Sequence, residues 1–307
     1  MSNPAHIPVL LPEVLASLAP APGEVYADCT AGLGGHAAAV AHRLGPGGTV
    51  ILNDLDAGNL AAAGERVSQT VPGIRLVSLH GNFAQIPYAA ENAGLAVGVL
   101  LADLGFASLH VDRAERGFSF GKEGPLDMRM DQSKGVTAAE LVASMNEREL
   151  AEMIAEFGEE RQAGRIARKL VQERARTPIT TTTHLAELIR GIVGWGAGGG
   201  IDPATRTFQA FRIAVNDEIG SIGALLAAIT ADGKRLLRDG RGRWLSPGAR
   251  IGFLTFHSLE DRPVKRAFAE LVSFGAADMT GGHVMATEAE MAVNPRARSA
   301  KLRVVRL

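Results

Sequence analysis

An acidic residue followed closely by three glycines is the feature of this sequence with the clearest chemistry. Asp28 ends an apolar segment that begins near residue 24, and Gly32, Gly34 and Gly35 precede a helix that we expect to start near His36. Glycines permit positive φ and let a ligand approach the backbone, and a helix N-terminus offers unpaired N–H groups. The pattern therefore predicts a strand, a tight turn and a helix that hold a nucleotide-like cofactor at the carboxyl edge of a sheet.

The charge of Asp28 separates two kinds of cofactor. The segment Gly32–Ala37 fits the dinucleotide fingerprint G-x-G-x-x-G/A. A carboxylate at the strand end would repel a pyrophosphate, however, and it suits a cationic group such as the ammonium of an amino acid. Asp28 with its glycines therefore resembles motif I of S-adenosylmethionine (SAM) methyltransferases. For the loop alone, an ordinary tight turn between strand and helix is the alternative.

The ends of the next two predicted strands supply candidate cofactor contacts. Asp54 ends the apolar run 49–54, where a carboxylate accepts hydrogen bonds from ribose hydroxyls, whereas Asp56 is placed to cap the following helix. Phe83 follows the run 74–79, where an adenine would lie in this layout. The pattern fits a Phe83 that flanks the adenine as well as one that packs in the core.

Asp103 ends the most apolar run, 95–103, which has the composition of a central parallel strand. The order Asp103-Leu-Gly-Phe106 resembles the Asp/Asn-Pro-Pro-Tyr site of amino-methyltransferases. An exocyclic amine of a nucleobase is a poor nucleophile because its lone pair is conjugated with the ring. A carboxylate that accepts its N–H bonds helps to localise that lone pair, and an aromatic face holds the base flat. Asp103 is therefore the candidate catalytic residue and Phe106 a candidate substrate contact, with a capping Asp and a core Phe as the alternative.

The elements that must position these residues alternate between strands and helices at both ends of the chain. We expect helices over 10–18 and 36–44, strands over 24–29, 49–54, 74–79, 95–103 and 250–256, and a reversed edge strand in the tail. Between them lie helical patterns only, with starts at Thr137 and Asn146, and a long helix is predicted after Asp202-Pro203. The predicted fold is α/β, with a discontinuous Rossmann-like domain at 1–109 and 206–307 and an all-helical insertion at 110–205.

Composition bears on compartment and on metal chemistry. The 307 residues are 46% hydrophobic with a formal charge of −1, and neither a membrane span nor a signal peptide is evident, so we expect a cytoplasmic protein. The single cysteine, Cys29, excludes a cysteine-based zinc site. His257 and Glu260 could act in acid–base or metal chemistry, but their spacing fits no standard metal motif, and Ser258 with Asp261 fits a helix start. We therefore expect no metal.

Nine motifs together identify a family. They are His6–Val14, Asp28–His36, Asp103–Gly105, Arg116–Phe120, Pro125–Asp131, Phe157–Arg161, Thr205–Glu218, Phe256–Arg262 and Asn294–Arg303. In this order they resemble the bacterial 16S rRNA cytosine-N4 methyltransferases, the RsmH (MraW) family, over essentially the whole chain.

The resemblance implies a SAM-dependent enzyme of the class I methyltransferase fold, with the insertion as its substrate-recognition domain. Its implied substrate is the exocyclic N4 of one cytidine in the decoding region of 16S rRNA, within the small ribosomal subunit. The family's cofactor contacts fall on Gly34, Gly35, His36, Asp54, Phe83 and Asp103. At His110 the family has a Gln that contacts the cofactor, and Phe106 stands where the family has Val.

Two basic segments are predicted to contact rRNA phosphates. One is the helix that follows Arg161, for which a solvated helix face is the alternative. The other is the tail, where Arg296 and Arg298 are the candidate substrate contacts. The oligomeric state stays open and includes a homodimer.

Three other functions fit parts of the sequence. A DNA amino-methyltransferase would share the fold and the Asp103-x-x-Phe106 site. A nicotinamide-dependent dehydrogenase fits the glycine loop alone, but Asp28 disfavours it. A scaffold that senses SAM or binds RNA without turnover is consistent with the His110 substitution.

Overall fold

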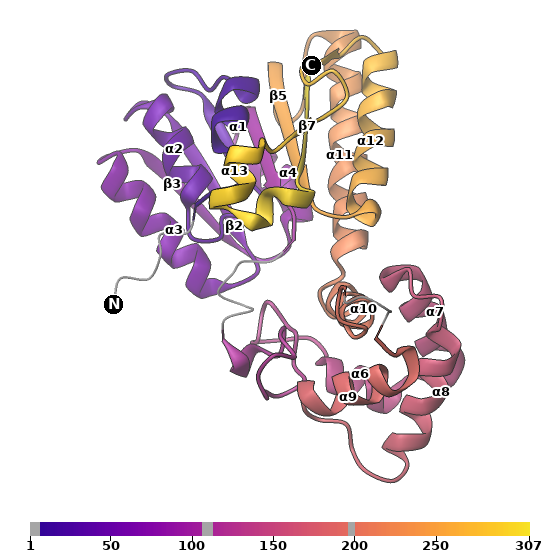
Figure 1. Ribbon diagram of the computed structural model, residues 1–307. Coiled ribbons are helices and arrows are strands. Elements are labelled where there is room, and N and C mark those ends of the chain that lie inside the picture. Colours follow the sequence, from indigo (N-terminus) through magenta and orange to yellow (C-terminus); the bar gives the residue numbers. More distant parts are fainter. Residues whose placement is uncertain (1–6, 106–112, 196–199) are drawn as a thin grey trace. The chain divides into compact units, whose positions relative to one another are not determined.

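The chain folds as two compact units in the computed structural model, which describes residues 7–105, 113–195 and 200–307 (Figure 1). The sheet unit comprises the chain up to Gly105 and from Ile219 onward, and the helical unit comprises 106–218. The sequence placed the second boundary at 205/206, ahead of α10 (Thr205–Asn216). The structure places it after α10, because this helix packs along α7 (Glu147–Gly158) and buries Phe208 and Phe211 in the helical unit.

The sheet unit contains one sheet in the order β3-β2-β1-β4-β5-β8-β6, and β7 pairs with β8. Strands β1 to β5 run parallel, and β8 is antiparallel to β5, which confirms the predicted reversal. The predicted edge position is wrong, because the short strands β6 and β7 pair with the other side of β8. The strands are β1 (Val25–Asp28), β2 (Thr49–Asp54), β3 (Arg75–His80), β4 (Val97–Asp103), β5 (Leu245–Thr255), β6 (Ala277–Asp278), β7 (Val284–Met285) and β8 (Lys301–Arg306).

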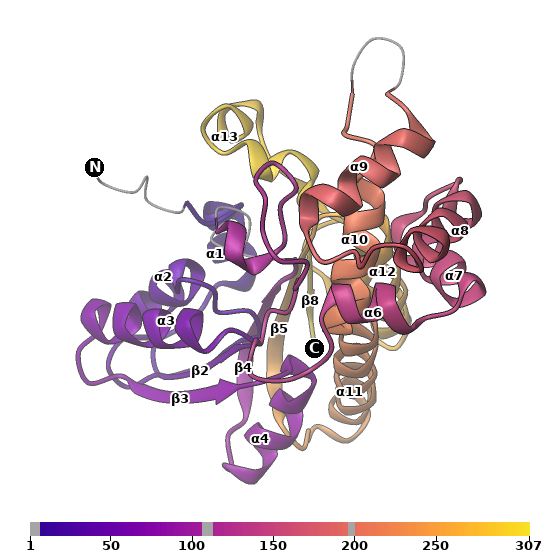
Figure 2. The ribbon, with the colours of Figure 1, turned by 90° about the horizontal axis from the view of Figure 1, so that it is seen from below.

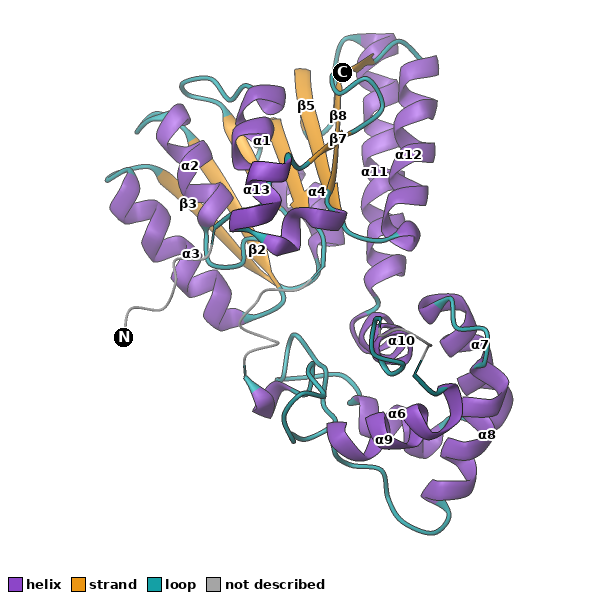
Figure 3. Ribbon diagram, in the orientation of Figure 1, coloured by secondary structure: helices purple, strands orange, loops and turns teal. Residues whose placement is uncertain are grey.

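Helices cover both faces of this sheet (Figures 2 and 3). Helices α1 (Leu11–Leu18), α2 (Gly35–Leu44) and α3 (Ala57–Thr70) share one hydrophobic cluster with the sheet. Helices α4 (Ile86–Asn92), α11 (Glu218–Asp239) and α12 (Ser258–Ser273) share the other. Burial on both faces explains why every residue of β4 before the final Asp103 is apolar. The C-terminal segment adds the short helices α13 (Glu288–Val293) and η3 (Pro295–Ser299).

The helical unit packs α6 (Ala138–Ser144), α7, α8 (Ala163–Arg174), α9 (Thr182–Val193) and α10. The predicted starts at Thr137 and Asn146 are confirmed, because each residue forms a capping box with a Glu three positions later. Two predicted starts differ from the structure. Asp202 accepts the N–H of Ala204 through Oδ1 at 2.9 Å, as a residue at a helix start does, but it also pairs with Arg190 at 2.7 Å, and the helix begins at Thr205.

The second correction concerns α12. Its N-cap is His257, which forms a capping box with Glu260, and the Glu260 carboxylate also accepts the N–H of Phe256 at 2.7 Å. The cap therefore lies one residue before the predicted Ser258, and Asp261 pairs with Arg303 at 2.8 Å. Glu260 is therefore a buried capping group, at 1% exposure.

Within the described ranges, no single helix is long and apolar enough to cross a membrane, and the consecutive pair α10 and α11 meets the requirement only when taken together across its bend.

Candidate active site

The site predicted from the sequence lies where the strand order reverses. The reversal falls between the neighbouring strands β1 and β4, and Asp28 and Asp103 are the last residues of these strands. Ligands of open α/β sheets bind outside the carboxyl ends of the strands at such a point. The N–H of Asp103 donates to Thr30 Oγ1 at 2.8 Å, so the loop after β1 is tied to the end of β4. The structure thus brings two predicted carboxylates to one corner of the sheet.

His36 joins these two carboxylates from the first turn of α2. Its Nε2 lies 2.9 Å from the carbonyl oxygen of Val9, and its Nδ1 lies 3.5 Å from Asp103 Oδ2. The side chains of His36 and Asp103 are 7% and 24% exposed. The second oxygen of Asp103, Oδ1, is buried and has no hydrogen-bond partner among the described residues. We call Asp28, His36 and Asp103 the switch-point cluster.

Burial dominates the protonation of this cluster. It raises the pKa of Asp28 to about 6, against the charge of His36 and the hydrogen bonds from Tyr26 and the Thr30 N–H. It raises the pKa of Asp103 to about 7, and the negative charge of Glu260 adds to this rise. It lowers the pKa of His36, while the nearby Asp28 opposes that change. All three groups are therefore held closer to neutrality than their free side chains would be.

The three glycines of the loop are required for different structural reasons. Gly32 and Gly34 have positive φ, at 51° and 74°. A Cβ on Gly34 would lie 2.8 Å from the backbone of Ala63 in α3, and one on Gly35 would lie 2.5 Å from the Pro8 ring. A Cβ on Gly32 would meet only a backbone oxygen of Thr30, at 3.9 Å. Close packing within the protein therefore requires Gly34 and Gly35, whereas Gly32 leaves its surroundings open.

Asp54 supports this loop from the end of β2. Its Oδ2 accepts the N–H of Gly32 at 2.8 Å, and its Oδ1 accepts the N–H of Asp56 at 2.8 Å. Asp56 is the N-cap of α3, as predicted.

Phe83 lies in the short helix η1 (Phe83–Gln85) after β3. It is half-buried and packs against the hydrophobic cluster beneath α4 and α11, so one part of the ring joins the core and another stays accessible. The predicted packing in the core is thus partly confirmed, and the contact of Phe83 with an adenine stays a prediction. Phe106 and His110, the other two residues predicted near this site, lie outside the described residues.

The basic residues divide into paired and exposed groups. In the tail, Arg303 pairs with Asp261 in the core of the sheet unit, whereas Arg296 and Arg298 are exposed on η3. In the helical unit, Arg168 binds Glu147 at 3.2 Å and Arg174 donates to the carbonyl oxygen of Met145 at 2.6 Å. Some arginines of the basic helix α8 therefore bind groups of the helical unit itself.

Sequence reasoning did not connect two groups with the switch-point cluster. The Tyr26 hydroxyl donates to Asp28 Oδ2 at 2.9 Å inside the core. Residues two apart on a strand share a face, so the spacing of Tyr26 and Asp28 was the available signal. Glu260 was considered for acid–base or metal chemistry, but no spacing linked it to Asp103, because it approaches from a helix far along the chain.

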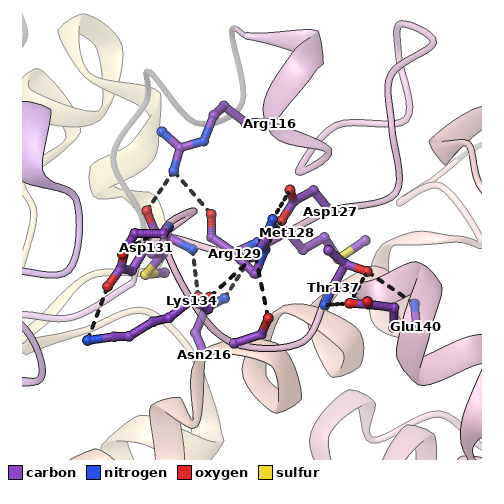
Figure 4. A network of polar contacts seen from close by, with 12 residues as sticks. Arg116, Asp127, Met128, Arg129, Asp131, Lys134, Thr137, Glu140 and Asn216 are labelled. Carbon is purple, nitrogen blue, oxygen red and sulfur yellow. Dashed lines mark hydrogen bonds and ion pairs between the residues drawn. The ribbon is translucent and has the colours of Figure 1, made fainter.

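A second buried polar network lies in the helical unit and contains the motif 125–131 (Figure 4). Leu126, Met128 and Met130 are buried, and the charged residues alternate with them. We call residues 126–131, with Arg116 and Asn216, the loop lock. Arg116 donates to the carbonyl oxygens of Arg129 and Met130 at 3.1 and 2.8 Å.

Asn216 completes the loop lock from the end of α10. Its amide donates to the Met128 carbonyl at 2.8 Å and its Oδ1 accepts the Met130 N–H at 2.7 Å. Asp127 binds Arg129 through two bonds of 2.8 and 2.9 Å. Burial opposes the ionisation of Asp127, but Arg129 outweighs it and holds the pKa of Asp127 below its usual value. This motif is therefore built to fix a backbone.

Comparisons with known proteins agree along the whole chain. Residues 3–307 match the MraW methylase family. A protein of Symbiobacterium thermophilum called ribosomal RNA small subunit methyltransferase H is 43% identical, over 98% of this chain and 96% of the relative. A protein of the same name from Pelobacter propionicus is 44% identical, over 99% of both chains. The structure of Aeropyrum pernix fibrillarin with bound SAM aligns with 95% of this chain and with 73% of the fibrillarin chain, at 10% sequence identity. Its TM-score of 0.38 is too low to support a conclusion about this protein.

The strand order, the antiparallel β8 and the glycine loop at the switch point define the class I SAM-dependent methyltransferase fold. This confirms the predicted fold class. The full-length matches narrow the class further: the chain belongs to the MraW methylase family. A nicotinamide-dependent dehydrogenase is thereby excluded, and the cofactor is SAM, as predicted.

The residues at the switch point fit this cofactor. SAM carries positive charge on its sulfonium and ammonium groups, and the corner presents the carboxylates of Asp28 and Asp103. The open space at Gly32 lets a ligand approach the loop backbone, and a carboxylate at the end of β2, Asp54, suits a ribose diol.

Proposed function

We propose that this enzyme transfers a methyl group from SAM to the exocyclic N4 of a cytidine in the decoding region of 16S rRNA, within the small ribosomal subunit. Membership of the MraW methylase family supports the reaction, and the names of its relatives support the substrate. The observation that carries the proposal is Asp103 Oδ1, a buried acceptor without a partner among the described residues, at the switch point of a SAM-binding fold.

The chemistry explains why an acceptor is needed there. The N4 lone pair of cytosine is delocalised into the ring, which weakens the amine as a nucleophile. Asp103 accepts an N–H bond from this amine and so favours the form with a localised lone pair. SAM, when bound, supplies an activated methyl group on sulfur. The rest of the protein's contribution is alignment and the exclusion of water, with direct transfer of the methyl group to N4.

The remaining cofactor contacts follow from their positions. Asp54 accepts hydrogen bonds from the ribose hydroxyls, and Phe83 lies against the adenine with its accessible part. The loop 32–36 provides backbone approach, with Gly34, Gly35 and His36 fixing its shape, and Asp28 supplies negative charge behind His36. His110 replaces the Gln of the family at the remaining contact.

The RNA contacts are proposed for Phe106, on the pattern of the sequence, and for two exposed arginines of the tail. Phe106 holds the cytosine ring flat, and Arg296 and Arg298 bind phosphates of the rRNA backbone. The helical unit serves as the substrate-recognition domain. Because ribosomal subunits are the substrate, we place the enzyme in the cytoplasm, and a homodimer is compatible with this function.

The direct test is methyl transfer from labelled SAM to small ribosomal subunits from cells that lack this gene. After digestion of the rRNA, mass spectrometry identifies the labelled nucleoside. We expect N4-methylcytidine, and reconstituted wild-type subunits that already carry the modification serve as the negative control. A label in DNA or in another nucleoside would contradict the base specificity. Binding of SAM without transfer would favour the non-catalytic scaffold.

A further inference from the structure

The imidazole of His36 is oriented by a backbone carbonyl group, which can only accept a hydrogen bond. Its Nε2 lies 2.9 Å from the carbonyl oxygen of Val9, and both residues are buried. A carbonyl has no proton to donate, so Nε2 must carry one. If the ring is neutral, its other nitrogen, Nδ1, is then an unprotonated acceptor.

This unprotonated nitrogen faces a carboxylate. Nδ1 lies 3.5 Å from Asp103 Oδ2, within ion-pair distance. Two lone pairs opposed at this distance repel each other, unless one proton resides on either atom. The Val9 carbonyl therefore turns His36 and Asp103 into a pair that gains from holding one shared proton.

The charges around the pair favour the uptake of that proton. Asp28 faces His36, and Glu260 faces Asp103, and both are negative when ionised. Their own charges are largely committed elsewhere. Asp28 accepts bonds from Tyr26 and the Thr30 N–H, and Glu260 accepts from the Phe256 N–H and pairs with His257 at 3.1 Å.

Asp103 is the accessible carboxylate of this group. Asp28 and Glu260 are each 1% exposed, whereas the Asp103 side chain is 24% exposed. Its Oδ1 is buried without a partner within the described ranges, so the exposed part of the carboxylate includes Oδ2, the oxygen that faces His36. The remaining titratable neighbours, Tyr26 and Cys29, are fully buried, and burial raises the pKa of each, so both stay neutral.

We propose that His36 and Asp103 form the proton acceptor of the methyl transfer, with Asp103 as the group that takes the proton and His36 as the positioning residue that stabilises it. The inference rests on the proposed function. It differs from a role in orientation alone, in which the proton passes directly to water.

The N4 lone pair forms the bond to the methyl carbon while the carbon–sulfur bond breaks and leaves its electron pair on sulfur. The methylated amine then carries one positive charge and loses one N–H proton to the Asp103 carboxylate, and the electrons of that N–H bond return to nitrogen. The proton is held between Asp103 Oδ2 and His36 Nδ1, and it later leaves to solvent.

The substitution His36→Gln tests the pair. A glutamine amide can reach the position of Nε2 and keep the bond to the Val9 carbonyl, but it cannot bind a proton as Nδ1 does. His42→Gln, at an exposed position of the same helix, is the matched control. Single-turnover transfer to small subunits is measured from pH 5.5 to 9, with SAM saturating for each variant.

In the wild type we expect the rate to rise with pH as the pair loses its shared proton. In His36→Gln the plateau should fall at least about tenfold, within the range of general-base effects. The inflection should move to lower pH by about one unit, because the protonated carboxyl group loses its partner. His42→Gln should match the wild type. Identical profiles for wild type and His36→Gln would overturn the proposal.

Nitrogen-15 NMR of the protein without SAM provides a readout that is independent of activity. We expect His36 to keep its proton on Nε2 across the titration, and we expect Asp103→Asn to shift the titration of Nδ1. A ring protonated on Nδ1 alone would overturn the shared proton. If wild-type enzyme transfers no methyl group to rRNA, the proposed function fails, whereas the NMR result still decides whether the pair holds a proton.

Discussion

The switch-point cluster and the loop lock both bury carboxylates, but they treat them in opposite ways. In the switch-point cluster, burial prevails and raises the pKa of Asp28 to about 6 and that of Asp103 to about 7. In the loop lock, the partners of Asp127 and Asp131 outweigh burial and hold both pKa values below the usual range. The loop lock therefore stabilises the ionised form of its carboxyl groups, whereas the switch-point cluster favours the neutral form.

The difference distinguishes carboxylates that stabilise the fold from carboxylates that serve the function. A buried acceptor without a partner costs stability, so a fold that retains one at Asp103 requires a ligand or substrate to satisfy it. The motif 125–131 is a specific signature of the family, yet its side chains and backbone are engaged with one another and with Arg116 and Asn216. This specific motif therefore marks the architecture, whereas the shorter motif that begins at Asp103 marks the chemistry.

The largest expected effect is that of Asp103→Asn, which should reduce methyl transfer about a hundredfold to ten-thousandfold. The amide keeps the size of the side chain but cannot take a proton. Because the carboxylate is held unfavourably, we expect no loss of unfolding free energy at pH 8. Single-turnover kinetics and urea denaturation measure the two quantities.

The matched control is Asp127→Asn in the loop lock. The same chemical change should cost about 2 kcal/mol of unfolding free energy, since a charge-assisted pair with Arg129 is lost. The transfer rate per folded molecule should change much less than in Asp103→Asn. A result with stability lost at Asp103 and retained at Asp127 would reverse the comparison.

The next effect in size concerns Arg116→Met. This change leaves the carbonyl oxygens of Arg129 and Met130 without their donor in a buried setting, and we expect a loss of about 3 kcal/mol. Arg148→Met, at an 82% exposed position of α7, should stay within about 0.5 kcal/mol of the wild type. Urea unfolding followed by circular dichroism provides both values, and equal stabilities would remove the structural role of the loop lock.

Much of this architecture was accessible from the sequence. The apolar runs ending at Asp28, Asp54 and Asp103 predicted the central strands, because a strand buried on both faces tolerates few polar residues. The boundary near α10 was not accessible. The apolar face of this helix is the same whichever unit it packs against, and only its contact with α7 assigns it to the helical unit.

The site divides in the same way. Asp28, His36 and Asp103 were identified individually, from strand ends and a glycine loop. Their joint protonation depends on the Val9 carbonyl and on Glu260, which reach the site from distant parts of the chain. The residues of the loop lock were identified only as parts of family motifs, because the contacts with Arg116 and Asn216 span long sequence separations.

The pH dependence of stability provides a smaller test of the comparison. Asp103 binds its proton more tightly in the folded protein than its usual pKa of 3.8 allows, so the unfolding free energy falls as pH rises from about 4 to 7. The difference between wild type and Asp103→Asn isolates this effect, which we expect to reach about 2 kcal/mol. Asp127 has the opposite sign, since its lowered pKa provides stability that is lost as pH falls below about 4. A flat difference curve for Asp103 would show that its carboxyl group is not held near neutrality.

The smallest expected effect comes from the tail, where paired and exposed charges lie a few residues apart. Arg303 is 8% exposed and bound to Asp261, whereas Arg296 and Arg298 are exposed. Replacing Arg296 and Arg298 together by Ala should weaken rRNA binding about fivefold and reduce the slope of log affinity against log salt by about two, with folding unchanged. Arg303→Ala should instead lower the unfolding free energy, because it leaves Asp261 without its buried partner. Binding measured at several salt concentrations, beside urea unfolding, distinguishes the two, and an unchanged salt slope in the double variant would exclude these arginines from the RNA interface.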